Sequence, residues 1–285
     1  MKNQIRFISS AEITRAVELL YTRACIGPHH IVEEKLSQIL SLEDPGPGRE
    51  ALEIEIANLK IAAETGLPIC QDTGTAVVFV EIGNLVCIID SSLGSAVDDG
   101  VLSACRKAYL RPSQVYPPMG ARENTMNNAP AIVHLEHVQG SQLKIWVLAK
   151  GAGSENVSRT AMLPPLAGFK GVAEMAENCV RDGASKACPP VIIGIGVGGN
   201  IETSGILAKK ALLRDLNSEN PVPELALFEK EITESLNSTG IGPQGFGGKT
   251  TVMETRILQL PCHLASLPVT VCIECHAHRT ASCVL

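Results

Sequence analysis

The sequence contains no uninterrupted apolar run that reaches the roughly 18 residues a membrane-spanning helix needs. Its N-terminus alternates polar and apolar residues, whereas a secretory signal places an apolar block after a basic stretch. Internal repeats and low-complexity linkers are also missing. We therefore expect a globular protein that stays in the cytoplasm and does not bind membranes.

Aromatic residues make up only 3% of the chain, and the net charge is −6. Nucleic acid binding needs a basic face, and single strands also need aromatic rings on which bases stack. Nucleic acid is therefore not an expected partner. An anionic ligand would require a few cationic side chains gathered locally in an otherwise acidic protein.

Cysteine, in contrast, is abundant for a chain of 285 residues, which is long enough to bury a full core. Disulfide frameworks are typical of small secreted domains, so we expect free thiols. Each thiol is by default a small buried apolar side chain, and a few are candidate metal ligands. The ten cysteines are Cys25, Cys70, Cys87, Cys105, Cys179, Cys188, Cys262, Cys272, Cys275 and Cys283.

The hydrophobic pattern predicts an α/β fold with mixed, partly antiparallel sheets packed with helices. Ser9 and Glu12 form a capping-box signature at the start of the first helix. We expect one domain over residues 1–285, with a helical part over about 1–66 and an α/β part over about 67–285. Helices are expected over 11–25, 31–43, 49–65, 98–110, 170–184, 202–216 and 224–238, strands over 76–83, 191–197, 250–260 and 269–275, and a hairpin over 131–138 and 143–150.

Three loops place a cysteine among proline, glycine and small polar residues: Cys70 in 68–74, Cys188 in 187–190 and Cys275 in 273–276. Proline fixes the backbone after Cys188, which suits a sulfur held as a rigid ligand on a turn. Composition alone favours the alternative, in which three unrelated core cysteines lie beside turns.

Two other readings belong to different functional classes. Starting at Gly194, the glycines up to Gly199 follow a strand with the spacing of a dinucleotide-binding turn, although we expect no βαβ order around them. Cys272, Cys275 and the two following histidines have the residue types of a zinc site. An extended strand would, however, point Cys272 and Cys275 to opposite faces. A non-catalytic zinc- or nucleotide-binding module is thus the alternative.

Seven motifs occur in order between about Arg49 and Ser282: PICQDTGTA, LRPSQ, KGAGSEN, ACPPVIIGIGVGG, GPQGFGGKTT, LPCHLASLPV and CIECHAHR. With them the chain resembles the N-terminal catalytic domain of class I fumarate hydratases and the alpha subunit of L-tartrate dehydratase. The resemblance implies a hydro-lyase that interconverts fumarate and (S)-malate. It also implies a [4Fe–4S] cluster on Cys70, Cys188 and Cys275, with one iron left open as a Lewis acid.

The resemblance further assigns site residues, each of which has a structural alternative. Asp72 would shuttle a proton or form an Asx turn, and His263 would act near the substrate or be purely structural. Arg111 would grip a carboxylate or cap a helix C-terminus as an exposed cation. The remaining implied substrate-binding residues are Gln71, Gly151, Gly153 and Lys249.

Single-chain members of the resembling family carry a second domain, whereas this sequence ends at Leu285. We therefore expect a hetero-oligomer in which a separate fumarase-type beta subunit completes the site for a small dicarboxylate. The GSEN stretch, residues 153–156 in KGAGSEN, favours fumarate, and the CHAHR stretch leans toward tartrate. Fumarate and malate are the expected substrates, with an L-tartrate dehydratase alpha subunit as the alternative.

Overall fold

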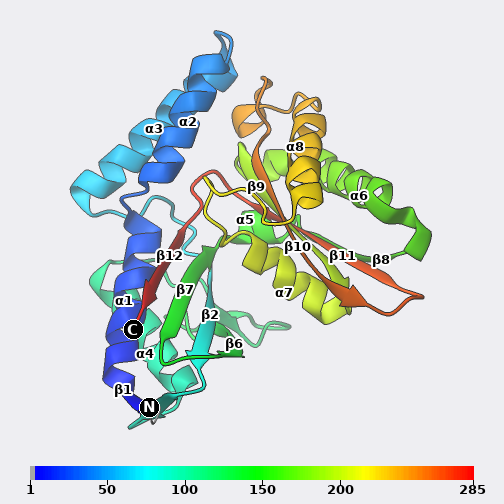
Figure 1. Cartoon of the computed structure of the whole chain (residues 1–285). Helices are drawn as coiled ribbons and strands as arrows, with labels where there is room; N and C mark the ends of the chain where they lie inside the picture. The colour runs from blue at the N-terminus through cyan, green and yellow to red at the C-terminus, as the bar shows by residue number, and fades with distance from the viewer. Residues whose placement is uncertain (1–3) are drawn as a thin grey trace. The chain divides into compact units, whose positions relative to one another are not determined.

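The structure, a computed structural model, describes residues 4–285 and divides into two compact units (Figure 1). The first comprises the described part of Met1–Pro28 with Leu59–Ala152 and Arg279–Leu285, and the second comprises His29–Asn58 and Gly153–His278. Two helices, α3 (Pro47–Thr65) and α5 (Ala152–Glu155), contain residues of both units. The expected α/β class with mixed sheets is confirmed. That residues 1–285 act as one domain stays a prediction.

The first unit is built on a four-stranded mixed sheet in the order β12-β7-β2-β6. Its strands are β2 (Thr75–Gly83), β6 (Ile132–Val138), β7 (Leu143–Lys150) and β12 (Thr280–Val284). Helices α1 (Ser10–Ile26) and α4 (Leu93–Lys107) pack together and form one core with the sheet. The Ser9–Glu12 capping box that begins α1 is present, as the sequence predicts.

The hairpin expected over 131–138 and 143–150 is wrong. Strand β2 lies between β6 and β7, pairing in parallel with β6 and antiparallel with β7. The connection after β6 instead crosses the end of β2, where the Gly83 N–H donates to Gln142 O at 2.9 Å and the Asn84 N–H to Val138 O at 2.8 Å. A turn sequence predicts that the chain reverses direction. It does not predict whether another strand lies between the two strands that the turn connects.

The second unit contains another four-stranded mixed sheet, in the order β10-β9-β11-β8. The strands are β8 (Arg159–Leu163), β9 (Val191–Gly199), β10 (Val252–Cys262) and β11 (Leu267–Glu274). Helices α6 (Gly168–Gly183) and α8 (Pro223–Asn237) share a core with one sheet face, and α7 (Ile201–Ala211) packs on the other (Figure 1). The unit also contains α2 (His30–Leu42) and short 3₁₀ turns at Pro165–Ala167, Ala184–Lys186 and Pro243–Gly245.

The glycines of β9 make room for helix α7. Residues alternate between the faces of a strand, so Ile193 and Ile195 enter the core with α6 and α8 while Gly194 and Gly196 face α7. A Cβ at Gly196 would lie 2.0 Å from Ser204 O. Because β9 and β10 pair in parallel with α7 and α8 between them, the expectation of no βαβ order is wrong. These two glycines nevertheless lie inside the strand and not in a phosphate-binding turn.

This packing predicts opposite effects for two glycine-to-alanine substitutions. Gly196→Ala should lower the free energy of unfolding by about 2–3 kcal/mol, because the new Cβ collides with helix backbone that cannot rotate away. Gly205→Ala, inside α7, should raise it by about 0.5–1 kcal/mol, because its Cβ meets nothing closer than Thr270 Oγ1 at 4.0 Å. Urea unfolding of both variants is the measurement, and destabilisation by Gly205→Ala would contradict the described packing.

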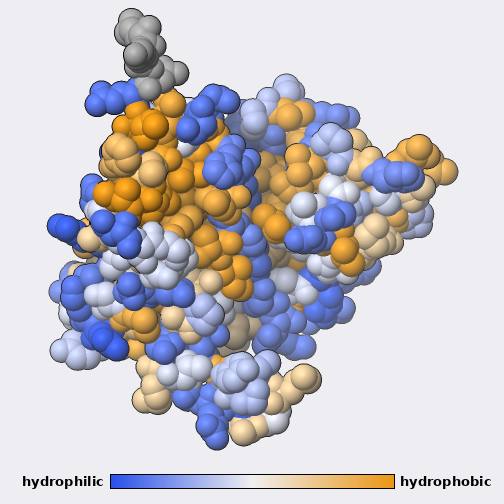
Figure 2. Space-filling view, turned by 90° about the horizontal axis from the view of Figure 1, so that it is seen from below, coloured by the Kyte–Doolittle hydropathy of each residue, from blue (hydrophilic) through white to orange (hydrophobic). Residues whose placement is uncertain are grey.

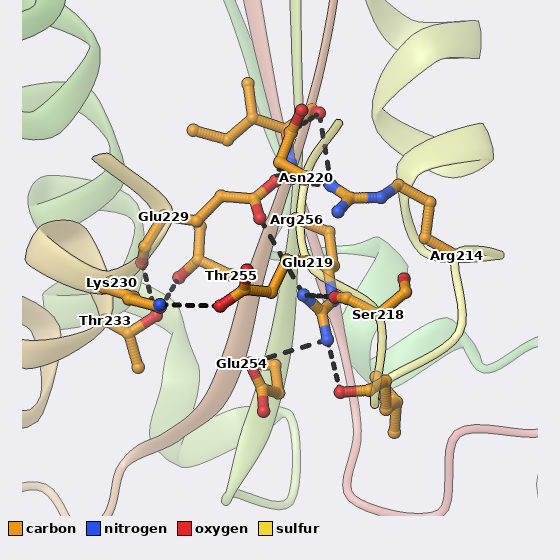
Figure 3. Close-up of polar contacts among 12 residues, drawn as sticks. Arg214, Ser218, Glu219, Asn220, Glu229, Lys230, Thr233, Glu254, Thr255 and Arg256 are labelled. Atoms are coloured by element: carbon orange, nitrogen blue, oxygen red, sulfur yellow. Dashed lines mark hydrogen bonds and ion pairs between the residues drawn. The ribbon is translucent and has the colours of Figure 1, made fainter. Parts of the chain in front are cut away.

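A network of charged side chains lies beside the sheet of the second unit (Figure 3). Glu229 on α8 is 4% exposed and pairs with Arg214, and its Oε2 lies 3.8 Å from Arg256 Nη1. Arg256 on β10 also donates to Ser218 O at 2.9 Å. The network therefore attaches the segment between α7 and α8 to the sheet, and it lines a cavity of about 400 Å³.

Two smaller sheets complete the first unit. Strands β1 (Arg6–Ser9) and β3 (Val86–Ile89) pair in parallel, and β4 (Val115–Tyr116) pairs antiparallel with β5 (Glu123–Asn124). Phe7 and Ile89 are exposed on the β1–β3 sheet, and Figure 2 shows apolar surface near the N-terminal end of the chain. Among residues 4–285, no helix has the length and apolar character required to cross a membrane.

Candidate active site

The Cys70 loop of the first unit connects the end of α3 to the start of β2. Gly66, with φ of 70°, ends the helix, and the following loop buries Ile69 and exposes Cys70 and Gln71. Cys70 Sγ accepts the Asp72 N–H at 3.4 Å. Amide donors to sulfur are a common feature around metal-bound thiolates, because they stabilise the charged form.

Asp72 holds this loop in shape with both carboxylate oxygens. Oδ1 accepts the Gly74 N–H at 3.0 Å, which is the Asx turn that the sequence offered as a structural alternative. Oδ2 accepts the Ala152 N–H at 2.7 Å. Gly74, with φ of 75°, is required here because a Cβ would lie 2.4 Å from Lys150 O. The Cys70 loop and the Gly151 segment are thus joined within one unit, and a catalytic role for Asp72 stays a prediction.

Arg111 belongs to the same region of the first unit. Its backbone O accepts Thr73 Oγ1 at 2.8 Å and Asn128 Nδ2 at 3.1 Å, so its position is tied to the Cys70 loop. The side chain is exposed, and no ion pair of the described residues engages its guanidinium. Such a group is available to an anion, which fits the predicted carboxylate-binding role.

Sequence reasoning missed Arg279 as a part of this site. Its side chain is only 2% exposed and donates from Nη1 to the Asp72 backbone O. The buried guanidinium therefore supports the turn that contains Asp72. The signal was present, since Arg279 is the last residue of the CHAHR stretch, but an arginine in a loop reads from sequence as a solvated cation.

In the second unit, the loops of Cys188 and Cys275 lie at the same end of the sheet. Cys188 precedes β9, Cys275 follows β11, and these strands are antiparallel with Ile192 opposite Glu274. The His276 N–H donates to Cys188 O at 3.3 Å, which joins the two loops directly. Two of the three cysteines singled out in the sequence are therefore on contacting segments.

Cys188 has a backbone conformation that non-glycine residues seldom adopt, with φ of 54°. A left-handed residue of this kind costs roughly 1–3 kcal/mol and persists where the surroundings impose it, commonly at functional sites. The Cys188 side chain is also exposed. The strained backbone thus presents a thiol at the surface, as expected for a ligand and not for a packing residue.

A buried polar group from α3 contacts the same two loops. Glu55 is 4% exposed, and its Oε1 accepts Gln244 Nε2 and lies 3.1 Å from His276 Nδ1. His276 Nδ1 is also 3.1 Å from Cys188 O. Burial raises the pKa of the Glu55 carboxyl to about 8, although the Gln244 hydrogen bond opposes that shift. Burial thus favours the neutral form of this carboxyl, which the helical sequence pattern gave no reason to expect.

The structure does not bring every predicted residue to these loops. His263 is exposed between β10 and β11, at the end of the second sheet opposite Cys188 and Cys275. At roughly 3.3 Å per residue, β9 separates these ends by roughly 25 Å. Lys249 Nζ lies 2.6 Å from Asp44 Oδ1 and donates to Leu42 O at 3.0 Å, so its charge is already paired. Gly153 begins the second unit's part of α5.

The family model described as "Fumarate hydratase (Fumerase)" matches residues 14–284. The chain belongs to the fumarate hydratase family. The match spans the Cys70, Cys188 and Cys275 loops and both units, and it confirms the resemblance carried by the seven motifs.

Several relatives are similar in sequence to this chain over most of their length. "Putative L(+)-tartrate dehydratase subunit alpha" of Methanocaldococcus jannaschii is 37% identical over 276 residues, which cover 95% of this chain and 96% of that protein. "L(+)-tartrate dehydratase subunit alpha" of Escherichia coli (strain UTI89 / UPEC) is 32% identical over 250 residues, and its counterpart in strain K12 is 31% identical over 250 residues. These two matches each cover 87% of this chain and 82% of the relative.

Most of the cysteines outside the three loops are buried. Cys25, Cys105, Cys179 and Cys272 are buried, as the default reading of a free cysteine expects. Burial raises the pKa of Cys25 to about 12 and that of Cys179 to about 11, so both remain protonated thiols. Cys87 and Cys262 are exposed outside the three loops, and Cys283 is half-buried.

The zinc alternative is not supported by the positions of its proposed ligands. Cys272 is buried in β11 with Ser158 Oγ at 3.7 Å from its sulfur, while His276 contacts Glu55 and Cys188. His278 is also buried, and this burial lowers its pKa to about 4. Across residues 4–285, no three or more His, Cys, Asp or Glu side chains lie together as a preformed metal site, and this holds for Cys70, Cys188 and Cys275 as well.

Proposed function

We propose that this chain is the alpha subunit of a hydro-lyase that interconverts fumarate and (S)-malate, working with a separate fumarase-type beta subunit. Membership of the fumarate hydratase family supports the reaction class. The printed names of its relatives, which call them alpha subunits of L(+)-tartrate dehydratases, support the need for a second subunit.

We further propose that Cys70, Cys188 and Cys275 hold a [4Fe–4S] cluster. The observation that carries this proposal is the contact between the Cys188 and Cys275 loops, combined with the strained backbone that exposes the Cys188 thiol. Cys70 adds an exposed sulfur with an amide donor, and Cys275 is half-buried. Thiolates are the ligands that such clusters take, and four-iron clusters with only three thiolates retain one open iron, which supplies Lewis-acid activation of a hydroxyl group.

The residues around Cys70 would bind and orient the substrate. The Arg111 guanidinium is free for a bidentate contact with a carboxylate, and Gln71 is exposed beside Cys70. Gly151 and Gly153 would contact the substrate through their backbone, and Lys249 would first have to leave Asp44. Asp72 is fixed within the same turn by both of its carboxylate oxygens. In this position the carboxylate would accept a proton from water and return it in the reverse reaction. The proton-handling role of His263 stays a prediction that the second unit by itself does not support.

The names of the relatives favour a second substrate, L-tartrate. Both substrates are C4 dicarboxylates, and both dehydrations remove a hydroxyl group next to a carboxylate. Cluster ligands and carboxylate-binding groups would therefore be shared. Fumarate and malate remain the proposed substrates because of the GSEN stretch, residues 153–156.

The test is an anaerobic assay of the chain alone, of a fumarase-type beta subunit from the same organism alone, and of the two together, with fumarate, (S)-malate and L-tartrate side by side. We expect no measurable turnover by either subunit alone and hydration of fumarate by the pair. The active pair should lose activity in air and regain it with ferrous iron and a reductant. Full turnover by the isolated chain would refute the two-subunit proposal, and turnover of tartrate alone would refute the substrate.

A further inference from the structure

We infer that Glu55 is a positioning residue for the proposed metal centre: through the His276 ring it holds together the two loops that carry Cys188 and Cys275. This inference rests on the proposed function, since those cysteines matter only if they are ligands. It assigns a role to a residue of α3 that is distant in sequence from both cysteines.

The contacts form a continuous chain within the second unit. Gln244 Nε2 donates to Glu55 Oε1, and the same oxygen lies 3.1 Å from His276 Nδ1. His276 in turn reaches the Cys188 backbone O from its ring at 3.1 Å and from its N–H at 3.3 Å. Because His276 directly follows Cys275, a fixed ring fixes the distance between the two cysteine-bearing segments.

The burial of Glu55 is otherwise unexplained. It occupies the apolar face of α3 next to Leu52, Ile56 and Leu59, which are all buried, where an apolar side chain would normally be expected. Its Oε2 is buried and has no hydrogen-bond partner. A buried polar group that is only partly satisfied is costly, so its presence calls for a role. The geometry offers one: Oε1 is placed to accept hydrogen bonds from Gln244 Nε2 and His276 Nδ1.

Packing alone does not hold the His276 ring. The ring borders a cavity of about 440 Å³, which Glu55, Gln244, Ile54 and Phe246 also line. Ile54 and Phe246 are themselves largely exposed, so they enclose this side of the ring only in part. The contacts with Glu55 and Cys188 hold the ring beside this partly open side. Loss of such an outer hydrogen bond typically reduces metal affinity by roughly 10–100-fold.

The experiment compares cluster retention in four single variants of the full chain. After anaerobic reconstitution, iron and acid-labile sulfide per chain are counted, and the absorbance at about 400 nm is followed after addition of an iron chelator. Glu55→Ala should lose the cluster roughly 10–100-fold faster than the wild type. Glu55→Gln should stay within about threefold of the wild type, because glutamine has the same length and keeps an acceptor oxygen.

Two further variants complete the design. Gln244→Asn shortens the donor, and asparagine tolerates the φ of 50° at this position, so the loss should accelerate less than in Glu55→Ala. Glu53→Ala, on the exposed side of the same helix, should behave as the wild type. Circular dichroism of each apo chain checks that the fold is kept, and Gln244→Asn carries the test if Glu55→Ala does not fold.

Failure of this inference is distinguishable from failure of the proposed function. A wild-type chain that takes up no cluster would refute the proposed metal centre itself. The other outcome is a wild-type chain that binds the cluster and a Glu55→Ala variant that releases it at the wild-type rate. If Glu55→Ala does not fold, the same comparison is made with Gln244→Asn. This outcome would overturn only the role of Glu55. Glu55→Gln as labile as Glu55→Ala would also overturn it, because the acceptor would then be irrelevant.

Discussion

Substitution of Cys188 by serine is expected to abolish hydro-lyase activity of the two-subunit enzyme and to remove most of the bound iron. Serine retains the size of the side chain but replaces the thiolate, which is the ligand that iron–sulfur clusters require. The left-handed φ of 54° at this position is imposed by the surrounding backbone, so the loop should keep its shape with serine. Iron analysis, the absorbance at about 400 nm and the anaerobic fumarate assay together measure the loss.

The matched control is Cys87→Ser. Cys87 is also exposed and free, but it lies on β3, outside the three cysteine loops. This variant should retain full activity and the full iron content. If Cys188→Ser kept its cluster and its activity, or if Cys87→Ser lost both, the assignment of ligands would be wrong.

Glu229→Ala is expected to destabilise the chain by about 3–5 kcal/mol, the cost of removing one partner from a buried ion pair. The carboxylate has two arginines beside it, and its Oε1 accepts the Ile257 N–H at 2.7 Å and Asn220 Nδ2 at 2.7 Å (Figure 3). Alanine would leave the Arg214 charge without its carboxylate partner in a low-dielectric region, and Arg256 would keep only Glu254, whose Oε2 lies 3.6 Å from its Nη2. Because whole proteins are stable by only about 5–15 kcal/mol, this single change should be close to the tolerated limit.

Thermal and urea unfolding of the apo chain measure the effect. Glu219→Ala is the control, because Glu219 pairs with Lys230 in full solvent at 2.8 Å. Exposed pairs contribute little to stability, so its unfolding midpoint should not change measurably. Equal midpoints for Glu229→Ala and the wild type would mean that the network is not the anchor of the segment between α7 and α8.

Local sequence signals predicted the elements well and their neighbours less well. The capping box at Ser9 and the long amphipathic helices are confirmed, because caps and helical periodicity act within a few residues. The 131–150 hairpin was wrong because strand order depends on a partner, β2, almost fifty residues earlier in the chain. Strand β12 was missed because five residues of mixed polarity give no periodic signal, and only pairing with β7 makes them a strand.

The candidate site divides along the same line. Cys188 and Cys275 were identified by motif, and their loops do contact each other in the second unit. Glu55 and Arg279 were not identified, because their importance comes from burial against segments far away in the chain. An acidic residue in a charged helix reads as solvated until the tertiary structure covers it.

The glycine-rich stretch at 194–199 has a practical consequence for recognising proteins from sequence. The glycine spacing is that of a phosphate-binding turn. Gly194, however, lies inside the sheet, paired with Arg256 on one side and Cys272 on the other, and helix α7 packs where a side chain would lie. A genome screen that scores glycine spacing alone will therefore assign cofactors to such chains in error. Asking whether the glycines lie within the strand, or beyond its last paired residue, is enough to separate the two cases.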